Sequence, residues 1–317
     1  MSKLAVLGAG AWGTALAIQA ARAGNEVVLW ARGGGEAIAA SRESPRLPGH
    51  RLPASVIVTG DRAAVSGTVI AAVPTQSLRA ALTGARGFGQ LVICAKGIET
   101  GTLRLPLEIA AEAQPNAVAA VLTGPNFAHE IASGLPAAAV VAGTDQPMRE
   151  AVARSLATPS FRLYGSDDPV GAQLGGAAKN VIAIAAGAVM GAGLGENARA
   201  ALITRGLAEL ARLTVALGGR AETVTGLSGL GDLLLTCTGP SSRNFSLGLA
   251  LGRGETLAAI LANRRAVTEG VATAPALLAR AQGVEMPICE AVAALLEGRT
   301  TLREAIAALL ARPRRDE

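Results

Sequence analysis

One glycine motif constrains the fold of this chain more than any other feature: GAGAWG at residues 8–13. The motif follows a short apolar run at residues 4–7 and opens a helix-like segment at residues 14–23, which Gly24 closes. A second apolar run follows at residues 27–30. Strand, glycine turn, helix and strand in this order are the context in which the spacing GxGxxG predicts a dinucleotide-binding βαβ unit.

Each glycine of the motif has its own physical reason. Gly8 permits a tight turn, Gly10 lets the backbone approach a pyrophosphate, and Gly13 permits close packing of the helix on the strand. The free N–H groups and the positive dipole at the helix N-terminus would then face the phosphates. The alternative interpretation is a glycine turn in an alanine-rich protein.

The first half of the chain continues to alternate. Helix-like segments, for example residues 104–112, separate several short apolar runs, which lie at residues 56–58, 68–73, 91–95, 118–122 and 138–141. After about residue 170 the strand-like runs end, and Ala/Leu-rich segments follow at residues 177–190, 198–217, 257–262, 274–281 and 288–296. These patterns predict an N-terminal doubly wound, mainly parallel α/β domain of the Rossmann type at residues 1–176, followed by an all-α domain at residues 177–317.

Composition limits the class of protein. The chain has 317 residues, half of them hydrophobic, which is enough for two domains and argues against disorder. A net charge of +5 fits nucleic acid, a membrane surface or a phosphorylated ligand. Basic residues are scattered, and only 2% of residues are aromatic, so few side chains could stack on bases. The dense cluster of Arg312, Arg314 and Arg315 is interpreted as a solvated tail, and no nucleic-acid partner is expected.

The cysteines and the uncharged stretches indicate no disulfide, metal site or membrane span. Cys94, Cys237 and Cys289 give neither a disulfide framework nor zinc-site spacing, and Cys94 is expected to be a buried small side chain. This cysteine content fits the cytoplasm, and no metal is expected. The uncharged stretch at residues 4–21 is interrupted by glycines, and that at residues 181–194 is shorter than the roughly 20 residues of a membrane span. We expect neither export nor membrane insertion.

The end of the second strand reports on the nucleotide. NAD-specific proteins usually place Asp or Glu about 20 residues beyond the glycine motif, where it holds the ribose hydroxyls. Here Arg32 occupies that place, and an arginine can meet a 2′-phosphate or stack on adenine. NADPH is therefore allowed and expected to be preferred over NADH, although Arg32 could also be an exposed arginine at a strand end.

Three further strand ends carry polar groups. In a doubly wound sheet the carboxyl ends of the strands line the ligand crevice. Lys96 follows one strand and would point towards the cofactor or an anionic substrate, or lie on the surface. After the next strand, Gly124 allows close backbone approach and Asn126 offers hydrogen-bond donors and acceptors. Pro74 and Pro125 stiffen their turns.

Lys179 lies in an apolar helix-like segment, with no other charge between Asp168 and Glu196. Such a lysine either extends to solvent or is held in a cleft. Burial would lower its pKa towards neutrality, which suits general acid–base catalysis. The two histidines, His50 and His129, are expected to be structural or exposed.

Two loops of the second half complete the candidate set. Asp232, in the glycine-rich turn GLGD, could orient Lys179, accept substrate hydroxyls or cap a helix. In the segment SSRN, Arg243 could grip a phosphate bidentately, while Ser242 and Asn244 add hydrogen bonds. A polar loop without function is the alternative.

At this point the chain resembles a known family. The motifs GAGAWGTALA, VPTQS, AKGIE, TGPNFAHE, QLGGAAKNVIAIAAG, ANARAALITRGLAE, GLSGLGDLLLTC, SSRN and VTEG occur in the order found in bacterial NAD(P)-dependent glycerol-3-phosphate dehydrogenases. They run from residue 8 to residue 270, which is nearly the whole chain. AAKNVIAIAAG and LSGLGDLLLTC are far more specific than the glycine motif.

The resemblance implies interconversion of dihydroxyacetone phosphate and sn-glycerol 3-phosphate, in the supply of glycerol phosphate for phospholipid synthesis. It implies that Lys179 is the catalytic acid/base. Positions that contact the nucleotide in the family are matched by Gly8, Gly10, Ala11, Trp12, Gly13, Arg32, Lys96, Ala128, Arg243, Val267 and Glu269. Positions that contact the substrate are matched by Lys96, Gly124, Asn126, Lys179, Asp232, Ser242, Arg243 and Asn244.

Three departures from the family pattern bear on binding. Asn126 stands where Ser or Thr is more frequent, and Ala11 stands where a serine is frequent and could contact the pyrophosphate. Phe245 and Ser246 follow the SSRN segment, where the family often has another basic residue.

Two other functions compete with this interpretation. A β-hydroxyacid-type dehydrogenase would use a carboxylate substrate, which Arg243 could also bind. A non-catalytic nucleotide-sensing relative need not retain both Lys179 and Asp232. Alanine-rich helices permit a homodimer through the helical domain, but nothing in the sequence requires one.

Overall fold

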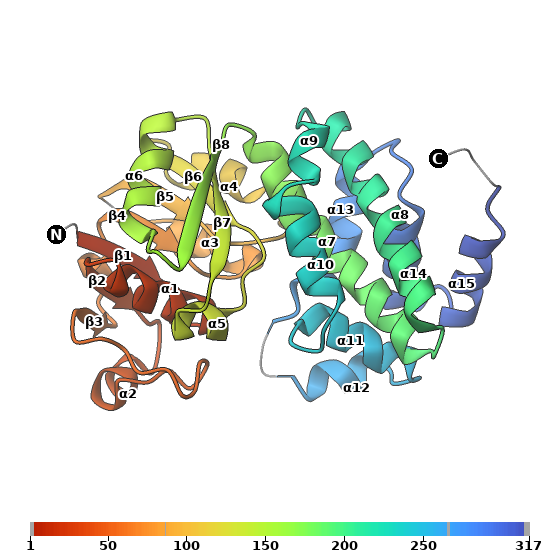
Figure 1. Cartoon of the computed structure of the whole chain (residues 1–317), viewed down its shortest axis with the longest axis horizontal. Coiled ribbons are helices and arrows are strands. Elements are labelled where there is room, and N and C mark those ends of the chain that lie inside the picture. Colours follow the sequence, from red (N-terminus) through yellow and green to blue (C-terminus); the bar gives the residue numbers. More distant parts are fainter. Residues whose placement is uncertain (1–2, 86, 265–266, 314–317) are drawn as a thin grey trace.

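The computed structural model describes residues 3–85, 87–264 and 267–313. They form two domains side by side, a sheet flanked by helices in the first half of the chain and a group of helices in the second (Figure 1). The predicted fold class is therefore confirmed. Of the predicted basic tail, Arg314 and Arg315 lie outside the described residues, and Arg312 forms an ion pair with Glu285.

Eight strands form one sheet in the order β3-β2-β1-β4-β5-β6-β7-β8. From β3 to β6 all neighbours are parallel, so the chain winds outward in two directions from the centre. The direction changes between β1 and β4, and ligands of such sheets bind outside the carboxyl ends of the strands at that place. The strands are β1 Lys3–Leu7, β2 Glu26–Trp30, β3 Val56–Thr59, β4 Gly67–Ala71, β5 Phe88–Ile93, β6 Val118–Thr123, β7 Ala137–Ala142 and β8 Phe161–Ser166.

The sheet is mainly parallel, as predicted, since only β7 against β6 runs antiparallel among its neighbouring strands. One strand differs from the prediction. β8 was not predicted, because only Phe161 of its six residues is fully buried and the others are partly or wholly exposed. An edge strand of this kind lacks the continuous apolar run that marks a buried parallel strand.

Helices cover both faces of the sheet. α1, α2, α5 and α6 pack in one core with buried residues of β1 and β2, and α3 and α4 pack in the core of the other face. α1 begins three residues before the predicted start at residue 14, because the last glycine of the motif lies in its first turn. The helices are α1 Ala11–Arg22, α2 Gly35–Ser41, α3 Thr75–Leu82, α4 Pro106–Ala113, α5 Ala128–Ser133 and α6 Gln146–Leu156.

The second half is helical, as predicted, but has more helices than its apolar runs indicate. Short helices begin directly at residues that the sequence places in polar loops, namely α10 at Asp232 and α11 at Arg243. The described helices are α7 Pro169–Gly191, α8 Gly195–Ala216, α9 Ala221–Val224, α10 Asp232–Cys237, α11 Arg243–Gly252, α12 Leu257–Ala262, α13 Glu269–Arg280, α14 Pro287–Leu296 and α15 Leu302–Leu310. A π-helical turn, Leu227–Gly231, leads into α10.

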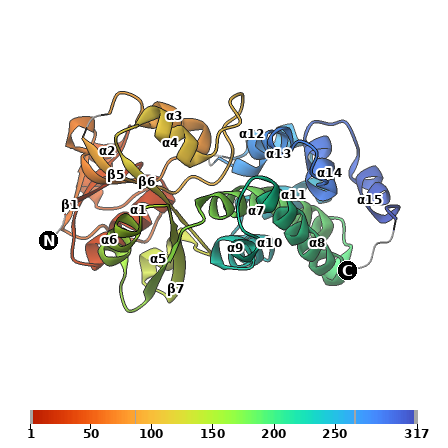
Figure 2. The ribbon, with the colours of Figure 1, turned by 90° about the horizontal axis from the view of Figure 1, so that it is seen from above.

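α7 is the central element of the molecule. It runs from the side of the sheet domain into the helical domain (Figure 2). Its length and apolar content would suffice to cross a membrane, yet 89% of its apolar window is buried within the protein, as in the core helix of a globular domain. A Cβ on Gly187 would lie 2.0 Å from the carbonyl oxygen of Phe245, so only glycine allows α11 to cross α7 this closely.

Candidate active site

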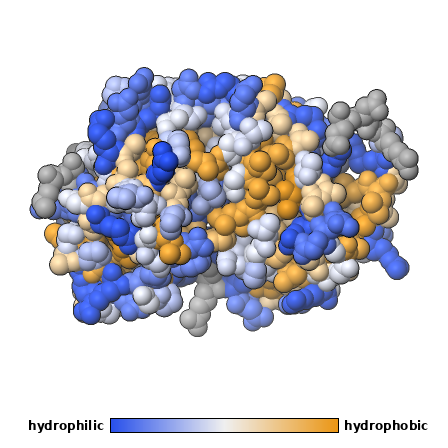
Figure 3. Space-filling view, in the orientation of Figure 1, coloured by the Kyte–Doolittle hydropathy of each residue, from blue (hydrophilic) through white to orange (hydrophobic). Residues whose placement is uncertain are grey.

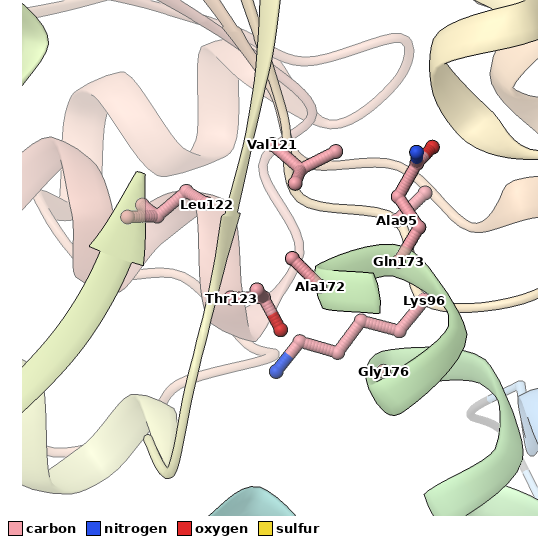
Figure 4. Close-up of a pocket in the computed structure, with 8 residues that line it drawn as sticks. All are labelled: Ala95, Lys96, Val121, Leu122, Thr123, Ala172, Gln173 and Gly176. Atoms are coloured by element: carbon pink, nitrogen blue, oxygen red, sulfur yellow. The ribbon is translucent and has the colours of Figure 1, made fainter. Parts of the chain in front are cut away.

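The candidate site lies where the carboxyl ends of β5 and β6 meet α7. Lys96 follows β5, and its Nζ donates to the carbonyl oxygen of Gly124, which follows β6, at 3.2 Å. Gly124 has φ +142°, and a Cβ there would lie 3.0 Å from the Cα of Ala139, so this turn requires glycine. The Lys96 side chain lies along a small pocket, past the hydroxyl of Thr123 (Figure 4).

Two lysines meet on one carboxylate at this junction. Lys179 of α7 donates from Nζ to Oδ1 of Asp232, the first residue of α10, and to Oγ1 of Thr236 at 3.0 Å. Lys96 donates to the other oxygen, Oδ2 of Asp232, at 2.6 Å. Lys179 and Asp232 are only 7% and 1% exposed. Lys179 is therefore held inside the junction and does not extend to solvent.

Burial and charge together set the protonation of this cluster. Burial lowers the pKa of Lys179 to about 8, against the attraction of Asp232, which favours the charged form. Burial also opposes the charged form of Asp232, but the two lysines outweigh it and keep the pKa of that carboxyl below its ordinary value. The cluster thus holds one stable carboxylate and one amine that exchanges its proton near neutral pH.

Asn180 is a residue of the site that the sequence interpretation missed. Its Nδ2 donates to the backbone carbonyl of Lys96 at 3.0 Å. Its Oδ1 accepts from Asn244 at 2.8 Å, and Oδ1 of Asn244 accepts from the N–H of Gly270 at 3.1 Å. A second polar residue beside Lys179, in an otherwise apolar segment, was the available signal. Asn244 therefore uses its amide within the protein framework.

The SSRN segment forms the start of α11. Ser242 caps this helix by accepting the N–H of Phe245 at 3.2 Å, and Phe245 itself is buried in the helical core. Arg243 is exposed and donates to the carbonyl of Val267 at 2.8 Å. The three predicted phosphate ligands thus differ, since only Arg243 presents an exposed charged group.

The family often has a basic residue directly after SSRN, and in this chain Arg264 supplies a basic group near that place. Arg264, which follows α12, donates to the carbonyl of Arg243 at 2.8 Å and to Oγ of Ser246 at 3.0 Å. Burial lowers the pKa of Arg264 from its ordinary value, and the charge of Arg243 adds to this. A second guanidinium therefore lies beside Arg243, although the sequence places it about twenty residues away.

The glycine motif forms a turn that only glycine can make. Gly8 has φ +114°, and a Cβ on Gly13 would lie 1.9 Å from the carbonyl oxygen of Gly8. A Cβ on Gly10 would meet nothing within 4 Å, so the space beside it is open. Among the described residues no side chain caps the N-terminus of α1, where Ala11 and Trp12 lie. This open, uncapped helix start fits a pyrophosphate.

The remaining predicted nucleotide contacts lie on both domains. Arg32 is exposed just beyond β2, and Ala128 begins α5. Val267 is 52% exposed, before α13. Glu269 begins α13 and accepts from the N–H of Thr75 at 3.0 Å, and burial raises its pKa. Glu269 therefore joins the helical domain to the start of α3.

Two buried acceptors near Lys96 have no hydrogen-bond partner within the described residues. They are Oγ1 of Thr123 and Oδ1 of Asn126, while Nδ2 of Asn126 donates to the carbonyl of Ala138 at 3.1 Å. Buried polar atoms are rarely left unpaired. The Asn126 acceptor suits a donor that the protein itself does not supply, such as a substrate hydroxyl.

Histidine and cysteine side chains are further titratable groups, and the charges of the cluster act on two of them, Cys94 and Cys237. The His129 side chain is 55% exposed and stacks on Phe127. Cys94, Cys237 and Cys289 are buried, and burial raises the pKa of each thiol. In the part of the chain that the structure describes, no three His, Cys, Asp or Glu side chains gather as metal ligands would.

Comparison with known proteins covers both domains. The family model for the N-terminus of NAD-dependent glycerol-3-phosphate dehydrogenase matches residues 3–149, and the model for its C-terminus matches residues 168–307. A glycerol-3-phosphate dehydrogenase [NAD(P)+] of Acidiphilium cryptum is 59% identical over an alignment of 320 positions, which covers 99% of this chain and 98% of the relative. One of Bradyrhizobium sp. is 54% identical, covering 98% of this chain and 97% of the relative.

A solved structure extends the likeness to three dimensions. The crystal structure of glycerol-3-phosphate dehydrogenase from Coxiella burnetii superimposes with a TM-score of 0.92 at 36% identity. The match covers 98% of this chain and 99% of that one.

Proposed function

The chain belongs to the family of NAD-dependent glycerol-3-phosphate dehydrogenases, and on that premise we propose how its site carries out the reaction. The protein is an NAD(P)-dependent oxidoreductase that interconverts dihydroxyacetone phosphate and sn-glycerol 3-phosphate. The convergence of Lys179 and Lys96 on Asp232, at the sheet edge that carries the glycine motif, supports this assignment most strongly.

The nucleotide would lie along the carboxyl edge of the sheet, with its pyrophosphate over the uncapped start of α1. Gly10 leaves the space, and the positive end of the helix dipole favours the phosphates. Arg32 is exposed just beyond β2, and its guanidinium could bind a 2′-phosphate, so we propose that NADPH is preferred over NADH. Contacts to the nucleotide would come from Gly8, Gly10, Ala11, Trp12, Gly13, Arg32, Lys96, Ala128, Arg243, Val267 and Glu269.

The chemical step needs a hydride and a proton. The reduced nicotinamide supplies the hydride when bound. Lys179 gives its proton to the carbonyl oxygen of the ketone, and takes it back in the reverse reaction, because its lowered pKa makes both forms accessible. Asp232 orients Lys179, and Lys96 offers a second positive charge to the developing alkoxide.

Substrate binding would use both sides of the junction. Arg243 holds the phosphate through charged hydrogen bonds, with Ser242 and Asn244 fixing the start of α11. Asn126 supplies its unpaired Oδ1 to a substrate hydroxyl, beside the glycine turn at Gly124. Each of these groups is placed by backbone contacts of its own, so the site is organised before the substrate arrives.

The test is oxidation of NADPH, then of NADH, by the purified protein given dihydroxyacetone phosphate. Unphosphorylated dihydroxyacetone and 3-oxo acids serve as control substrates. We expect rapid turnover with the phosphorylated ketone alone. Tight NADPH binding without turnover of that ketone would contradict the substrate assignment, and turnover of a 3-oxo acid instead would favour a β-hydroxyacid-type dehydrogenase.

We further propose that residues 1–176 and 177–317 are the two working domains. Ala172, in the first turns of α7, packs with the sheet, whereas Ala177 packs in the helical core. Trypsin digestion of the native protein should leave this junction uncut, because it lies inside α7, and should cut surface loops instead. A cut within α7 would contradict the proposed division.

We also propose that the protein acts in the cytoplasm, where it supplies glycerol phosphate for phospholipid synthesis, and that it forms a homodimer through the helical domain. Figure 3 shows apolar side chains at the surface of the helical half. Exposed large apolar residues of that half include Leu194, Val215, Leu234, Leu261 and Leu310. Sedimentation equilibrium of the wild type and of Val215→Glu tests the dimer, and a wild-type monomer at micromolar concentration would contradict it.

A further inference from the structure

The segment that follows Lys96 has no role in the chemistry proposed above. We call it the strap, residues 97–105, which lie between the end of β5 and the start of α4. In Figure 2 it reaches from the sheet domain towards α13 of the helical domain. A segment that follows Lys96 directly and contacts both domains can control the position of the Lys96 side chain.

The strap is anchored in both domains. Ile98 and Leu105 are fully or almost fully buried, and both belong to the core of the helical domain. On the sheet side, Arg79 of α3 binds Glu99 with two nitrogens, at 3.0 Å from Nε and 2.7 Å from Nη2. The N–H of Glu99 donates to the carbonyl of Arg104 at 3.0 Å and closes the loop.

The strap contains a strained residue that Arg280 holds in place. Leu103 has φ +58°, a left-handed conformation that a side chain of this kind rarely adopts. Its carbonyl oxygen accepts from Nη1 of Arg280 at 2.6 Å. The same guanidinium binds both oxygens of Glu108 in α4, each at 2.8 Å. These hydrogen bonds all run from α13 to the sheet domain.

α13 contacts the sheet domain at its first residue, in its middle and at its last residue. At its first residue, Glu269 binds the start of α3, as described above. In its middle, Thr273 and Thr75 enclose Gly97, where a Cβ would lie 2.8 Å and 2.9 Å from their hydroxyl oxygens. At its last residue stands Arg280. The peptide of Lys96 therefore lies beside a helix that is fixed at both ends.

We propose that Arg280 is a positioning residue for the reaction: by holding Leu103 and Glu108, it fixes the two domains so that Lys96 stays within reach of Asp232. The Lys96–Asp232 ion pair, 2.6 Å long, crosses the same junction, so it responds to any shift between the domains. This inference rests on the proposed function, in which Lys96 contacts the substrate.

A displaced Lys96 has a signature that general destabilisation lacks. The charged groups that face Lys179 among the described residues are Asp232, from α10, and Lys96, from the end of β5. The charge of Lys96 lowers the pKa of Lys179. If Lys96 moves away, Lys179 keeps its proton to higher pH. The alkaline limb of the pH profile for ketone reduction then moves to higher pH.

The experiment compares Arg280→Met with Arg22→Met. Arg22 is a matched control, since it binds the carbonyls of Ile131 and Ala132, at 3.0 and 2.6 Å, within the sheet domain alone. We expect Arg280→Met to lower kcat for dihydroxyacetone phosphate about tenfold, as a displaced catalytic group does, and to move the alkaline limb upward. NADPH affinity should fall less than kcat, because most of the proposed nucleotide contacts, such as Gly10 and Arg32, lie in the sheet domain away from Arg280. Arg22→Met, corrected for its folded fraction, should show neither kinetic change.

Further variants separate the remaining outcomes. Lys96→Met should show a larger loss and the same pH shift; wild-type kinetics there would contradict the proposed function of Lys96 itself. If Arg280→Met has normal kinetics while Lys96→Met is defective, the proposed role of Arg280 is overturned and that of Lys96 is not. The same holds if Arg22→Met shows kinetic changes equal to those of Arg280→Met. If Arg280→Met does not fold, Arg280→Lys and Glu108→Gln replace it. Both should change kcat and the pH profile in the same direction by smaller amounts. Wild-type kinetics in both would overturn the proposal.

Discussion

The two sides of the site present different chemical groups to their ligands. At the glycine motif, the sheet domain offers backbone: a glycine turn, an uncapped helix start and open space beside Gly10. The helical domain offers charged side chains that are buried and paired, above all Lys179 and Asp232. Steric exclusion fixes the first side, and charge compensation fixes the second.

The difference matters for how each side tolerates change. Backbone N–H groups need no particular protonation state, so binding at the glycine turn should be nearly independent of pH around neutrality. A buried amine and carboxylate depend on each other, because removing one leaves the other as an uncompensated charge. Substitutions on the two sides should therefore affect nucleotide binding and chemistry separately, which four predictions test.

The largest effect is expected at Lys179. Lys179→Ala should lower kcat by about a thousandfold, because it removes the general acid. NADPH affinity, followed by the fluorescence of the bound nucleotide, should remain near the wild-type value. Substantial turnover in this variant would remove Lys179 from the proton-transfer step.

The next effect tests the opposite side. In Gly13→Ala the new Cβ would lie 1.9 Å from the carbonyl of Gly8, so the turn must open. Misplaced N–H groups should weaken NADPH binding by roughly one to two orders of magnitude, given a strain of about 1–3 kcal/mol. Gly239→Ala is the control, because a Cβ there meets nothing within 4 Å. Equal affinities for the two variants would contradict this account of the turn.

Arg243 should show an effect on the substrate phosphate. A charged hydrogen bond contributes about 1.5–3 kcal/mol, so Arg243→Ala should raise the KM for dihydroxyacetone phosphate at least about tenfold. The preference for this substrate over unphosphorylated dihydroxyacetone should fall by the same factor. An unchanged preference would place the phosphate elsewhere.

The smallest effect is a pH dependence without mutation. Because the pKa of Lys179 is lowered to about 8, its protonated form, which reduction needs, is lost as the pH rises through that value. Oxidation of glycerol 3-phosphate needs the neutral amine and should gain over the same range. Stopped-flow measurement of hydride transfer in both directions would show the two opposite limbs, and parallel limbs would contradict the assignment.

The sequence predicted the parts of this molecule that depend on local pattern. The strands of the parallel sheet are short apolar runs, and the glycine turn follows from sterics alone. β8 escaped prediction because an edge strand pairs on one side and keeps few apolar residues. α10 and α11 escaped because they begin at Asp232 and Arg243, whose polar character is typical of loops.

The site itself was predictable as a set of residues but not as a geometry. The isolated charge of Lys179 in an apolar segment marked it in the sequence. That Lys96 shares Asp232 with it depends on two domains meeting, across more than a hundred residues of chain. Arg264 beside Arg243, and Arg280 on Glu108, are likewise products of tertiary packing.

Asp232 binds two lysines, and this pairing has a consequence for the catalytic cycle. Once Lys179 has given up its proton, it no longer balances the carboxylate, and a lone buried anion would cost several kcal/mol. Lys96 remains bound to the other oxygen and acts as a resident counter-ion during that interval. Asp232 can thus stay ionised in every step, and the amine can wait neutral for its next proton without the junction coming apart.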